Sequence, residues 1–300
     1  MAMTVRPRRS VLYMPGSNPR AMEKGKTLQA DGLILDLEDA VAPDAKAQAR
    51  TQIGAAIQGG GYGKRELIVR TNGLNTAWGY EDLVFAATSG ADAVLLPKVE
   101  SADLVRQAEQ ILVASGAPAD LKIWCMMETP LAMLNAKEIA GASPRLGAFV
   151  MGTSDLAKDL HAAHTRDRLP MITSLGLCML AARAYGLAIL DGVYLDLNDD
   201  EGFAASCRQG VELGFDGKTL IHPKTLAATN ATFGPSADEV AHSRRIIDAF
   251  QAAVAEGKGV VLVDGKLVEN LHVENARRLV ALAEAIEVLE AESASNSASN

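Results

Sequence analysis

Short apolar runs alternate with longer amphipathic segments along most of the chain. The runs are continuously apolar, which is typical of strands in a parallel sheet that is covered on both faces. The segments between them show helical spacing, and several begin at Ser or Asp and end at Gly, as helices tend to. The predicted strands are residues 10–15, 32–38, 66–71, 93–98, 122–127, 147–152, 188–193 and 217–222.

Eight such strands, each followed by a helix, predict an α/β fold in which the sheet closes into a (β/α)₈ TIM barrel. The competing arrangement is a doubly wound open sheet, which usually carries a glycine-rich phosphate loop after its first strand. Here the first strand is followed by PGSNPR, with one glycine and two prolines, so the dinucleotide fingerprint is missing. We therefore predict a catalytic barrel over residues 1–235.

The pattern changes after the eighth unit. A long amphipathic helix, a hairpin that turns at Asp264 and Gly265, and a final helix are predicted at residues 236–257, 259–269 and 274–292. Residues 236–292 would thus form a C-terminal extension that serves as a lid or an oligomer element. The small polar residues 293–300 are expected to be disordered.

Composition narrows the function classes. The 300 residues are 48% hydrophobic with a net charge of −8, which fits a globular protein and disfavours nucleic acid as a partner. No apolar run is long enough to span a membrane, and the basic first residues lack an apolar signal core, so we expect a cytoplasmic protein. Three scattered cysteines in apolar runs, Cys125, Cys178 and Cys207, are expected to be buried reduced thiols.

Charged residues gather where the predicted strands end, which is where barrels of this kind place their catalytic groups. Glu128 and Asp155, from two different strands, are suited to hold a hard divalent cation. Arg70 would clamp a carboxylate or stabilise an enolate. The polar residues at strand ends are Asp36, Glu38, Asp39, Arg70, Lys98, Glu128, Asp155, Asp191 and His222.

A structural role stays open for each of these residues, because a carboxylate at a strand end also serves as a helix cap or an ion-pair partner. Asp36 and Asp191 are flanked by apolar strand and are expected to be structural, and Lys98 is expected to pair with a rim acid. A further cluster around the first strand would cradle phosphates or form a solvated helix face. It comprises Arg8, Arg9, Arg20, Lys24 and Lys26.

Seven segments stand in order at predicted strand ends or turns. They are RSVLYMPGSNPRAMEK, GLILDLEDAVAPDAK, IVRTNG, VLLPKVE, MMETP, VMGTSDLAKDL and GFDGKTLIHP. Together they resemble the citrate lyase β-subunit-like family of CoA-ester enzymes, within the HpcH/HpaI aldolase superfamily. The resemblance covers about residues 9–290.

The resemblance implies a homo-oligomer, a trimer or hexamer, that uses Mg²⁺ (or Mn²⁺) and acts on CoA thioesters of 3-hydroxy dicarboxylic acids. Arg70 would stabilise the enolate and touch the substrate, and Glu38 and Asp39 would organise hydrogen bonds around it. The remaining assignments are Glu128 and Asp155 to the metal, with Glu128 also at the substrate, Tyr13, Arg20 and Lys24 to CoA, and the backbone of Gly152, Thr153 and Ser154 to the 2-oxo acid carboxylate.

One position departs from the lyases of this family, which often carry an Asp in a C-terminal lid motif that reaches a neighbouring subunit. Here GKLVENLHVENARR has Glu269 instead, one methylene longer. A misplacement on the order of 1 Å can cost about 10²-fold in rate. With GLCMLAARAYGL and LDGVY, this stretch resembles the malyl-CoA thioesterase branch. The resemblance therefore implies hydrolysis of (3S)-malyl-CoA to malate and CoA, with Glu269 as a base for water.

Three alternatives remain at this point: a malyl-CoA, methylmalyl-CoA or citramalyl-CoA lyase, a non-catalytic CoA-ester-binding subunit, and an aldolase acting on free 2-oxo acids. The intact Arg70, Glu128 and Asp155 argue against the second. The basic first turn argues against the third, because free acids need no phosphate cradle. The sequence does not separate thioester hydrolysis from carbon–carbon cleavage, since both need the same metal and the same arginine.

Overall fold

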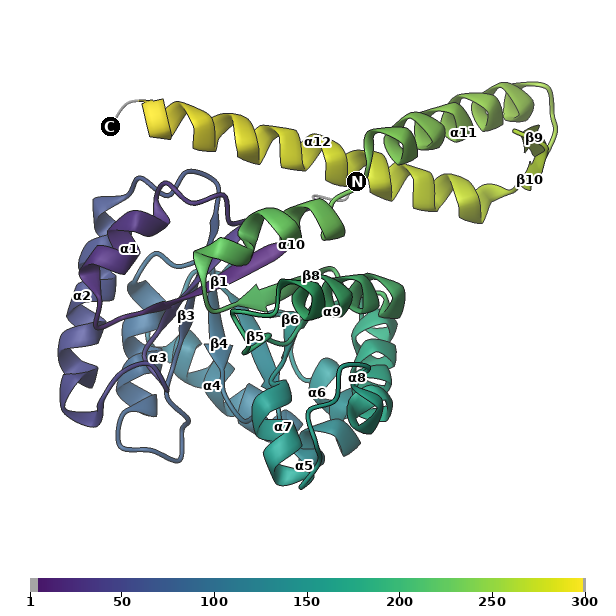
Figure 1. Ribbon diagram of the computed structural model, residues 1–300. Helices are drawn as coiled ribbons and strands as arrows, with labels where there is room; N and C mark the ends of the chain where they lie inside the picture. Colours follow the sequence, from purple (N-terminus) through teal and green to yellow (C-terminus); the bar gives the residue numbers. More distant parts are fainter. Residues whose placement is uncertain (1–4, 299–300) are drawn as a thin grey trace.

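The eight predicted strands close into one parallel barrel in chain order (Figure 1). The computed structural model describes residues 5–298, with side chains up to residue 292. The predicted TIM-barrel fold is confirmed. The strands are β1 (Ser10–Pro15), β2 (Gly32–Asp36), β3 (Glu66–Arg70), β4 (Ala93–Leu96), β5 (Lys122–Met127), β6 (Leu146–Met151), β7 (Ala188–Asp191) and β8 (Gly217–Leu220).

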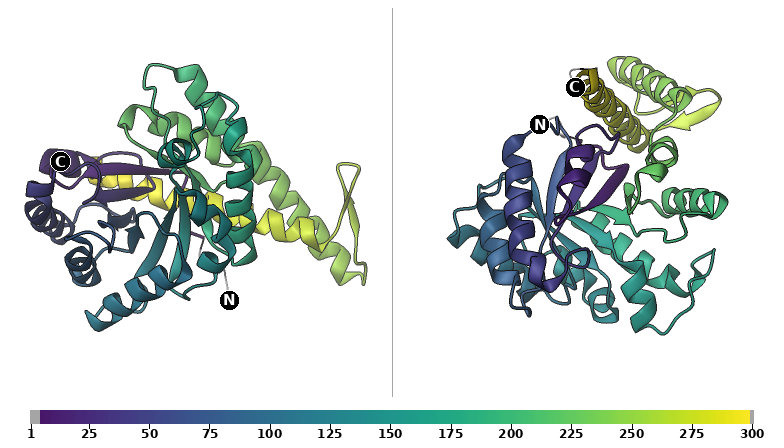
Figure 2. Two further views of the ribbon diagram at one scale, coloured as in Figure 1. Left: turned by 90° about the horizontal axis from the view of Figure 1, so that it is seen from below. Right: turned by 60° about the vertical axis from the view of Figure 1, so that its left-hand side comes forward.

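Helices surround the barrel and connect its strands (Figures 1 and 2). One example is α4, in which Ser101 caps the first turn and Val105, Ala108 and Leu112 face the core. The wall consists of α1 (Pro19–Gly25), η1 (Pro43–Ala45), α2 (Lys46–Gly59), α3 (Gly79–Thr88), α4 (Ala102–Ala114), α5 (Pro130–Leu134), α6 (Ala136–Ala140), α7 (Thr153–Asp159), η2 (Leu169–Met171), α8 (Ile172–Ala184), α9 (Asp200–Leu213), η3 (Pro223–Thr225) and α10 (Leu226–Phe233).

The interior of the barrel is a packed core. Side chains from successive strands, such as Val11, Ile34, Ile68 and Leu95, form one buried apolar cluster inside it. A second, larger apolar layer fills the space between the barrel and its helices. Because the interior is filled, a ligand has access only at an end of the barrel, and the site must lie where the inward positions turn polar.

The C-terminal extension is a helical hairpin with a small sheet at its tip. α11 (Ala237–Ala255) begins at a capping box of Ser236 and Glu239, and it packs against α12 (Asn270–Ala298). Between them, β9 (Val261–Val263) pairs antiparallel with β10 (Lys266–Val268). The turn residues Asp264 and Gly265 have φ of 49° and 77°, the backbone that a two-residue hairpin requires, so the predicted turn is confirmed.

The extension lies at the amino end of the barrel strands. Glu290 of α12 bonds Arg9, just before β1, at 3.0 Å, and Lys64, just before β3, lies 2.7 Å from Glu292. Figure 1 shows α12 across this end, opposite α5 and α7, and Figure 2 shows the β9–β10 tip projecting into solvent. The extension therefore does not cover the carboxyl rim of its own barrel.

The boundaries of the extension differ slightly from expectation. α12 begins four residues before the predicted position 274 and its backbone continues to Ala298. Of the tail predicted to be disordered, residues 299–300 and the side chains of 293–298 lie outside the described part of the chain. The division into a barrel over 1–235 and an extension over 236–292 stays a prediction.

Two further expectations concern the core and the membrane. Cys125, Cys178 and Cys207 are buried and unpaired, as predicted. Within residues 5–298, no helix has the length and apolar character needed to cross a bilayer.

Asp191 lies at the centre of a buried ion-pair network on the outer face of β7. Its carboxylate is 2.5 Å from Arg168 and 2.8 Å from Lys218, whose ammonium also donates to Ser206. Burial alone would raise the pKa of Asp191, but these two cations lower it. The expected structural role of Asp191 is confirmed: it ties β7 to β8 and to the loop before η2.

Replacement of Asp191 by Asn should destabilise the barrel strongly. The change leaves the ammonium of Lys218, which is 1% exposed, without its anionic partner. Breaking a buried pair from one side costs about 3 to 5 kcal/mol, and we expect a loss of about 3 kcal/mol in urea unfolding. The control is Asp103→Asn, which removes an exposed pair with Arg106 and should stay within about 0.5 kcal/mol. Equal effects of the two substitutions would contradict this prediction.

Candidate active site

A buried arginine–aspartate pair closes the top of the barrel core. Arg70 and Asp36 are the last residues of β3 and β2 and are neighbours in register. Both guanidinium donors, Nε and Nη2, lie 2.6 Å from the Asp36 oxygens, a bidentate pair. Asp36 also accepts the backbone N–H of Glu38 at 2.8 Å and of Ala40 at 3.1 Å. One carboxylate thus fixes both the arginine and the start of the following loop.

The third guanidinium nitrogen of Arg70 faces the open rim. Its Nη1 is 2.8 Å from Glu38 Oε2 and 3.4 Å from Asp39 Oδ2. The contact with Glu38 is ionic, because Glu38 Oε2 has no hydrogen bond of good geometry to any described residue. Burial would lower the pKa of Arg70, but Asp36 outweighs it and raises the pKa. Arg70 is therefore a permanent cation among three carboxylates.

Tyr13 lies inside the barrel rather than on its outer rim. The Arg70 guanidinium lies over its ring at 4.9 Å, and its hydroxyl is 3.8 Å from the sulfur of Met126. Burial raises the pKa of Tyr13, so its hydroxyl stays protonated. Tyr13 lies beneath Arg70, on the interior side. The CoA contact predicted for Tyr13 would therefore require the end of the ligand to reach into the barrel.

Glu128 follows β5 and is almost completely buried. Its Oε1 accepts the backbone N–H of Lys98 at 2.7 Å, and its side chain lies against Gly152. A Cβ at Gly152 would come within 2.3 Å of the Glu128 Cβ, so only glycine fits there. Burial raises the pKa of Glu128 to about 7, and the charges of Glu38 and Asp155 add to the effect while Lys98 opposes it.

Asp155 completes the same side of the rim. It is the third residue of α7, half-buried, and its charge acts on both Glu128 and Lys98. Gly152 is the N-cap of α7, followed by the buried Thr153 and the half-buried Ser154. Asp155 and the predicted backbone contacts at residues 152–154 therefore belong to one short segment, which lies beside Glu128.

Lys98 links two of these carboxylates. Its ammonium is 3.2 Å from Glu38 Oε1, which confirms the expected pairing with a rim acid. Burial raises the pKa of Glu38, and Asp39 adds to this, while Arg70 and Lys98 counteract it. Lys98, which follows β4, thus contacts both Glu38, which follows β2, and Glu128, which follows β5.

The composition of this rim suits a divalent cation. Five carboxylates face two cations, and carboxylate oxygens are the ligands that Mg²⁺ prefers. Within residues 5–298 no group of three or more His, Cys, Asp or Glu forms a complete metal cage. Any Mg²⁺ at Glu128 and Asp155 would need waters and ligand oxygens to complete its coordination.

The expectation of one cationic patch around the first turn is wrong for three of its members. Arg8 and Arg9 precede β1, so they lie at the amino end of the barrel, paired with Glu66 and Asp31. Lys26 pairs with Glu23 beyond the end of α1. The patch is reduced to two side chains on α1, Arg20 and Lys24. Both are exposed, stand one helical turn apart and form no ion pair with a described residue.

Glu269 does not join the other predicted site residues. It follows β10 at the tip of the C-terminal extension, is exposed, and donates its backbone N–H to His272 at 3.1 Å. The tip projects away from the barrel, whose amino end α12 covers (Figures 1 and 2). A catalytic role for Glu269 stays a prediction, and it requires a second copy of the chain.

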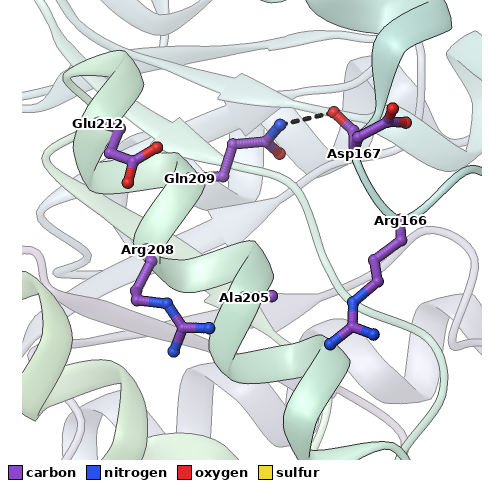
Figure 3. A pocket seen from close by; sticks show the side chains of 6 residues that line it. All are labelled: Arg166, Asp167, Ala205, Arg208, Gln209 and Glu212. Carbon is purple, nitrogen blue, oxygen red and sulfur yellow. Dashed lines mark hydrogen bonds between the residues drawn. The ribbon is translucent and has the colours of Figure 1, made fainter.

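A separate pocket of about 540 Å³ opens between the segment before η2 and α9 (Figure 3). It shares no residue with the carboxylate rim. Its two arginines are balanced by two acids, and Gln209 donates to the backbone of Asp167. The lining residues are Arg166, Asp167, Ala205, Arg208, Gln209 and Glu212.

Sequence reasoning missed the part that Asp36 plays in the site. It was expected to be structural, yet its whole carboxylate is used to aim Arg70. The sequence does indicate this pairing, because Asp36 and Arg70 stand at equivalent positions at the ends of neighbouring strands. An arginine at the end of an apolar strand needs such a partner in order to be buried.

The chain matches known proteins over most of its length. The profile of the HpcH/HpaI aldolase/citrate lyase family matches residues 9–223. A (3S)-malyl-CoA thioesterase of Cereibacter sphaeroides is 53% identical, over 95% of this chain and 98% of that protein. An L-malyl-CoA/beta-methylmalyl-CoA lyase of the same species is 36% identical, over 95% and 97%.

Among solved structures, protein CitE from Mycobacterium tuberculosis in complex with magnesium, acetoacetate and coenzyme A has a TM-score of 0.73. It is 28% identical, and the match covers 94% of this chain and all of that one. The predicted resemblance is thereby confirmed, and so is the prediction that the chain is an enzyme of the thioesterase and lyase family.

Glu128→Gln should stabilise the protein above neutral pH. The raised pKa of Glu128 means that the folded state holds more protons than the unfolded chain between about pH 4.5 and 7. Stability is therefore lost as the pH rises through that window. Glutamine keeps an acceptor for the Lys98 N–H and avoids the buried charge.

We expect Glu128→Gln to gain up to about 3 kcal/mol over the wild type at pH 8, and much less at pH 5. The measurement is urea unfolding in EDTA at both pH values. Asp159→Asn, on the exposed end of α7, is the control and should show no such dependence. A Glu128→Gln protein that is less stable than the wild type at pH 8 would show that the buried charge has no cost.

Proposed function

The chain belongs to the HpcH/HpaI aldolase/citrate lyase family, and from that premise we propose that it is a Mg²⁺-dependent enzyme that hydrolyses (3S)-malyl-CoA to malate and CoA. The observation that carries the proposal is a rim on which Glu38 lies 2.8 Å from the permanent cation Arg70 and also acts on the charge of Glu128, which is coupled in turn to Asp155. Hydrolysis is favoured over carbon–carbon cleavage because the thioesterase relative is 53% identical and the lyase relative 36%.

Each residue of the rim has a place in this chemistry. Mg²⁺ held by Glu128 and Asp155 would polarise the oxygens of the bound acyl group. Arg70, locked by Asp36, would place its charge where negative charge develops on the thioester oxygen. Because the pair is already formed in the free protein, the arginine needs no rearrangement when the reaction occurs. Glu38 and Asp39 hold its outward-facing nitrogen.

The remaining predicted contacts concern the rest of the substrate. Arg20 and Lys24 on α1 would meet the phosphates of CoA, because two exposed cations one turn apart are free to pair with them. The backbone N–H groups at the start of α7, over residues 152–154, would receive the carboxylate of the acyl group. Water needs a base, and Glu269 from a second copy would supply it.

The second candidate is a malyl-CoA, methylmalyl-CoA or citramalyl-CoA lyase. The same Arg70 would stabilise the acyl-CoA enolate released by retro-Claisen cleavage, so the rim geometry fits this reaction equally well. The observation that favours it is the lyase relative, which covers 95% of this chain. Glu269 would then act where lyases of the family often have Asp.

We further propose a cytoplasmic homo-oligomer, a trimer or hexamer, in which the tip of one extension reaches the rim of another copy. The support is geometric: the rim of each barrel is uncovered by its own extension, and Glu269 lies at the far tip. A ring or another closed arrangement would then complete every site.

Product analysis separates the two candidate reactions. Purified protein is incubated with malyl-CoA and Mg²⁺, and free thiol, malate, glyoxylate and acetyl-CoA are followed together. We expect equal amounts of malate and thiol without glyoxylate, and loss of turnover in EDTA. Arg70→Lys, which loses the bidentate pair with Asp36, should lower kcat by about 10²-fold or more. Glyoxylate and acetyl-CoA without thiol release would make the protein a lyase.

Mixing two inactive variants tests the shared site. Glu269→Gln and Arg70→Ala should each lose turnover. If the two residues act from different copies, co-expression of both chains should restore part of the activity, because some sites then hold both native residues. Hybrid oligomers that stay inactive, or a Glu269→Gln protein with normal turnover, would contradict the assignment. Glu256→Gln, in the loop before β9, is the matched control and should be fully active.

A further inference from the structure

Lys98 holds an unusual position at the rim, two residues beyond the end of β4. Its backbone has φ of 48°, the left-handed region that side chains other than glycine rarely adopt. The other described non-glycine residues with this backbone lie in the loop after α7 and in the hairpin turn. They are His161, Arg168 and Asp264.

A strained backbone at a site indicates that the surrounding structure uses it. Glycine or asparagine would adopt this conformation more readily than lysine. The conformation directs the Lys98 N–H at Glu128 Oε1, at 2.7 Å, a bond that any residue in this backbone could make. The lysine itself must therefore contribute through its side chain.

The side chain of Lys98 acts on a different carboxylate. Its ammonium is 3.2 Å from Glu38 Oε1, while Glu38 Oε2 lies 2.8 Å from Arg70. Glu38, with its side chain 12% exposed, is thus held between two cations. Lys98 is 47% exposed and faces the rim, and its charge interacts with Glu128 and Asp155 as well.

We propose that Lys98 is a positioning residue of this centre. Its backbone N–H fixes the position of the Glu128 carboxylate, and its ammonium holds the Glu38 carboxylate against Arg70. The same positive charge partly neutralises the carboxylate cluster before a cation binds. This inference rests on the proposed function, because it assigns Lys98 a part in a cation-dependent reaction. Lys98 would then couple the two proposed metal ligands, Glu128 and Asp155, to Arg70 through Glu38.

The two effects of the side chain oppose each other, and this makes the inference testable. Removing the ammonium leaves the Glu128 hydrogen bond in place and takes one positive charge away from the carboxylates, so a divalent cation should bind more tightly. It also frees Glu38 and with it the outward nitrogen of Arg70, so turnover should fall. A lysine that merely stabilised the loop would give weaker cation binding instead.

The experiment uses the full-length protein with Mn²⁺ as the probe. Mn²⁺ binding is measured by electron paramagnetic resonance without substrate, and kcat and KM for malyl-CoA are measured at saturating Mg²⁺. For Lys98→Met we expect Mn²⁺ to bind about threefold more tightly. We expect kcat to fall about tenfold or more, with KM changed less. Lys98→Arg, which keeps charge and reach, should recover most of kcat.

Two further variants guard against misfolding. Lys98→Gly removes the strain and the ammonium together, so it should melt no lower than the wild type and still lose kcat as Lys98→Met does. Lys137→Met, on the exposed face of α6, should change neither quantity. Weaker Mn²⁺ binding in Lys98→Met, or an unchanged kcat, would overturn the inference while the wild type still turns over malyl-CoA. A wild-type protein that neither binds Mn²⁺ nor cleaves malyl-CoA would overturn the proposed function, and the inference with it.

Discussion

The pair of Arg70 with Asp36 is the constraint around which the rim is built. A guanidinium that is only 7% exposed is tolerated when its charge and its donors are matched, and Asp36 matches two donors at 2.6 Å each. The remaining nitrogen, Nη1, is left for Glu38 and Asp39. Because both residues end neighbouring strands, the pair is positioned by the barrel ladder itself rather than by a loop. Tyr13 beneath the guanidinium then fixes its plane.

The carboxylates around this pair work against stability in the free protein. Burial and like charges raise the pKa of Glu128 to about 7, which means that ionising it in the folded state costs free energy. If a divalent cation binds here as proposed, the same cost would favour its binding, because the cation would remove the repulsion that makes ionisation unfavourable. Close packing against Gly152 prevents Glu128 from relaxing away from the site. The cluster therefore lowers the stability of the folded protein, and a bound cation would recover that loss.

The fold and most of the rim were predictable from sequence because strands that follow one another in the chain are also neighbours in the barrel. Apolar runs located the strands, and the polar residue at each strand end, such as Arg70 or Glu128, was bound to lie on the same rim. Sequence proximity failed where it conflicts with this geometry. Arg8 and Arg9 are close to Arg20 in the chain, but one strand length separates the two ends of β1, and they pair at the amino end instead. The left-handed backbone of Lys98 could not be predicted from the sequence, because lysine rarely adopts that conformation.

The position of the C-terminal extension determines what effect Glu269 can have, where lyases of the family often have Asp. Within a rigid site, one extra methylene would misplace a base and cost rate. Here Glu269 stands on the tip of a helical hairpin whose α12 is tied to the amino end of its own barrel at Arg9 and Lys64, far from the rim. Its distance to any rim would be set by how two copies dock, and a small shift in docking offsets a side chain that is longer by one bond. The Glu269 side chain by itself therefore does not decide between hydrolysis and carbon–carbon cleavage. In the proposed oligomer, the outcome would instead depend on whether the docked tip brings a water molecule to the thioester carbon or excludes water from the enolate.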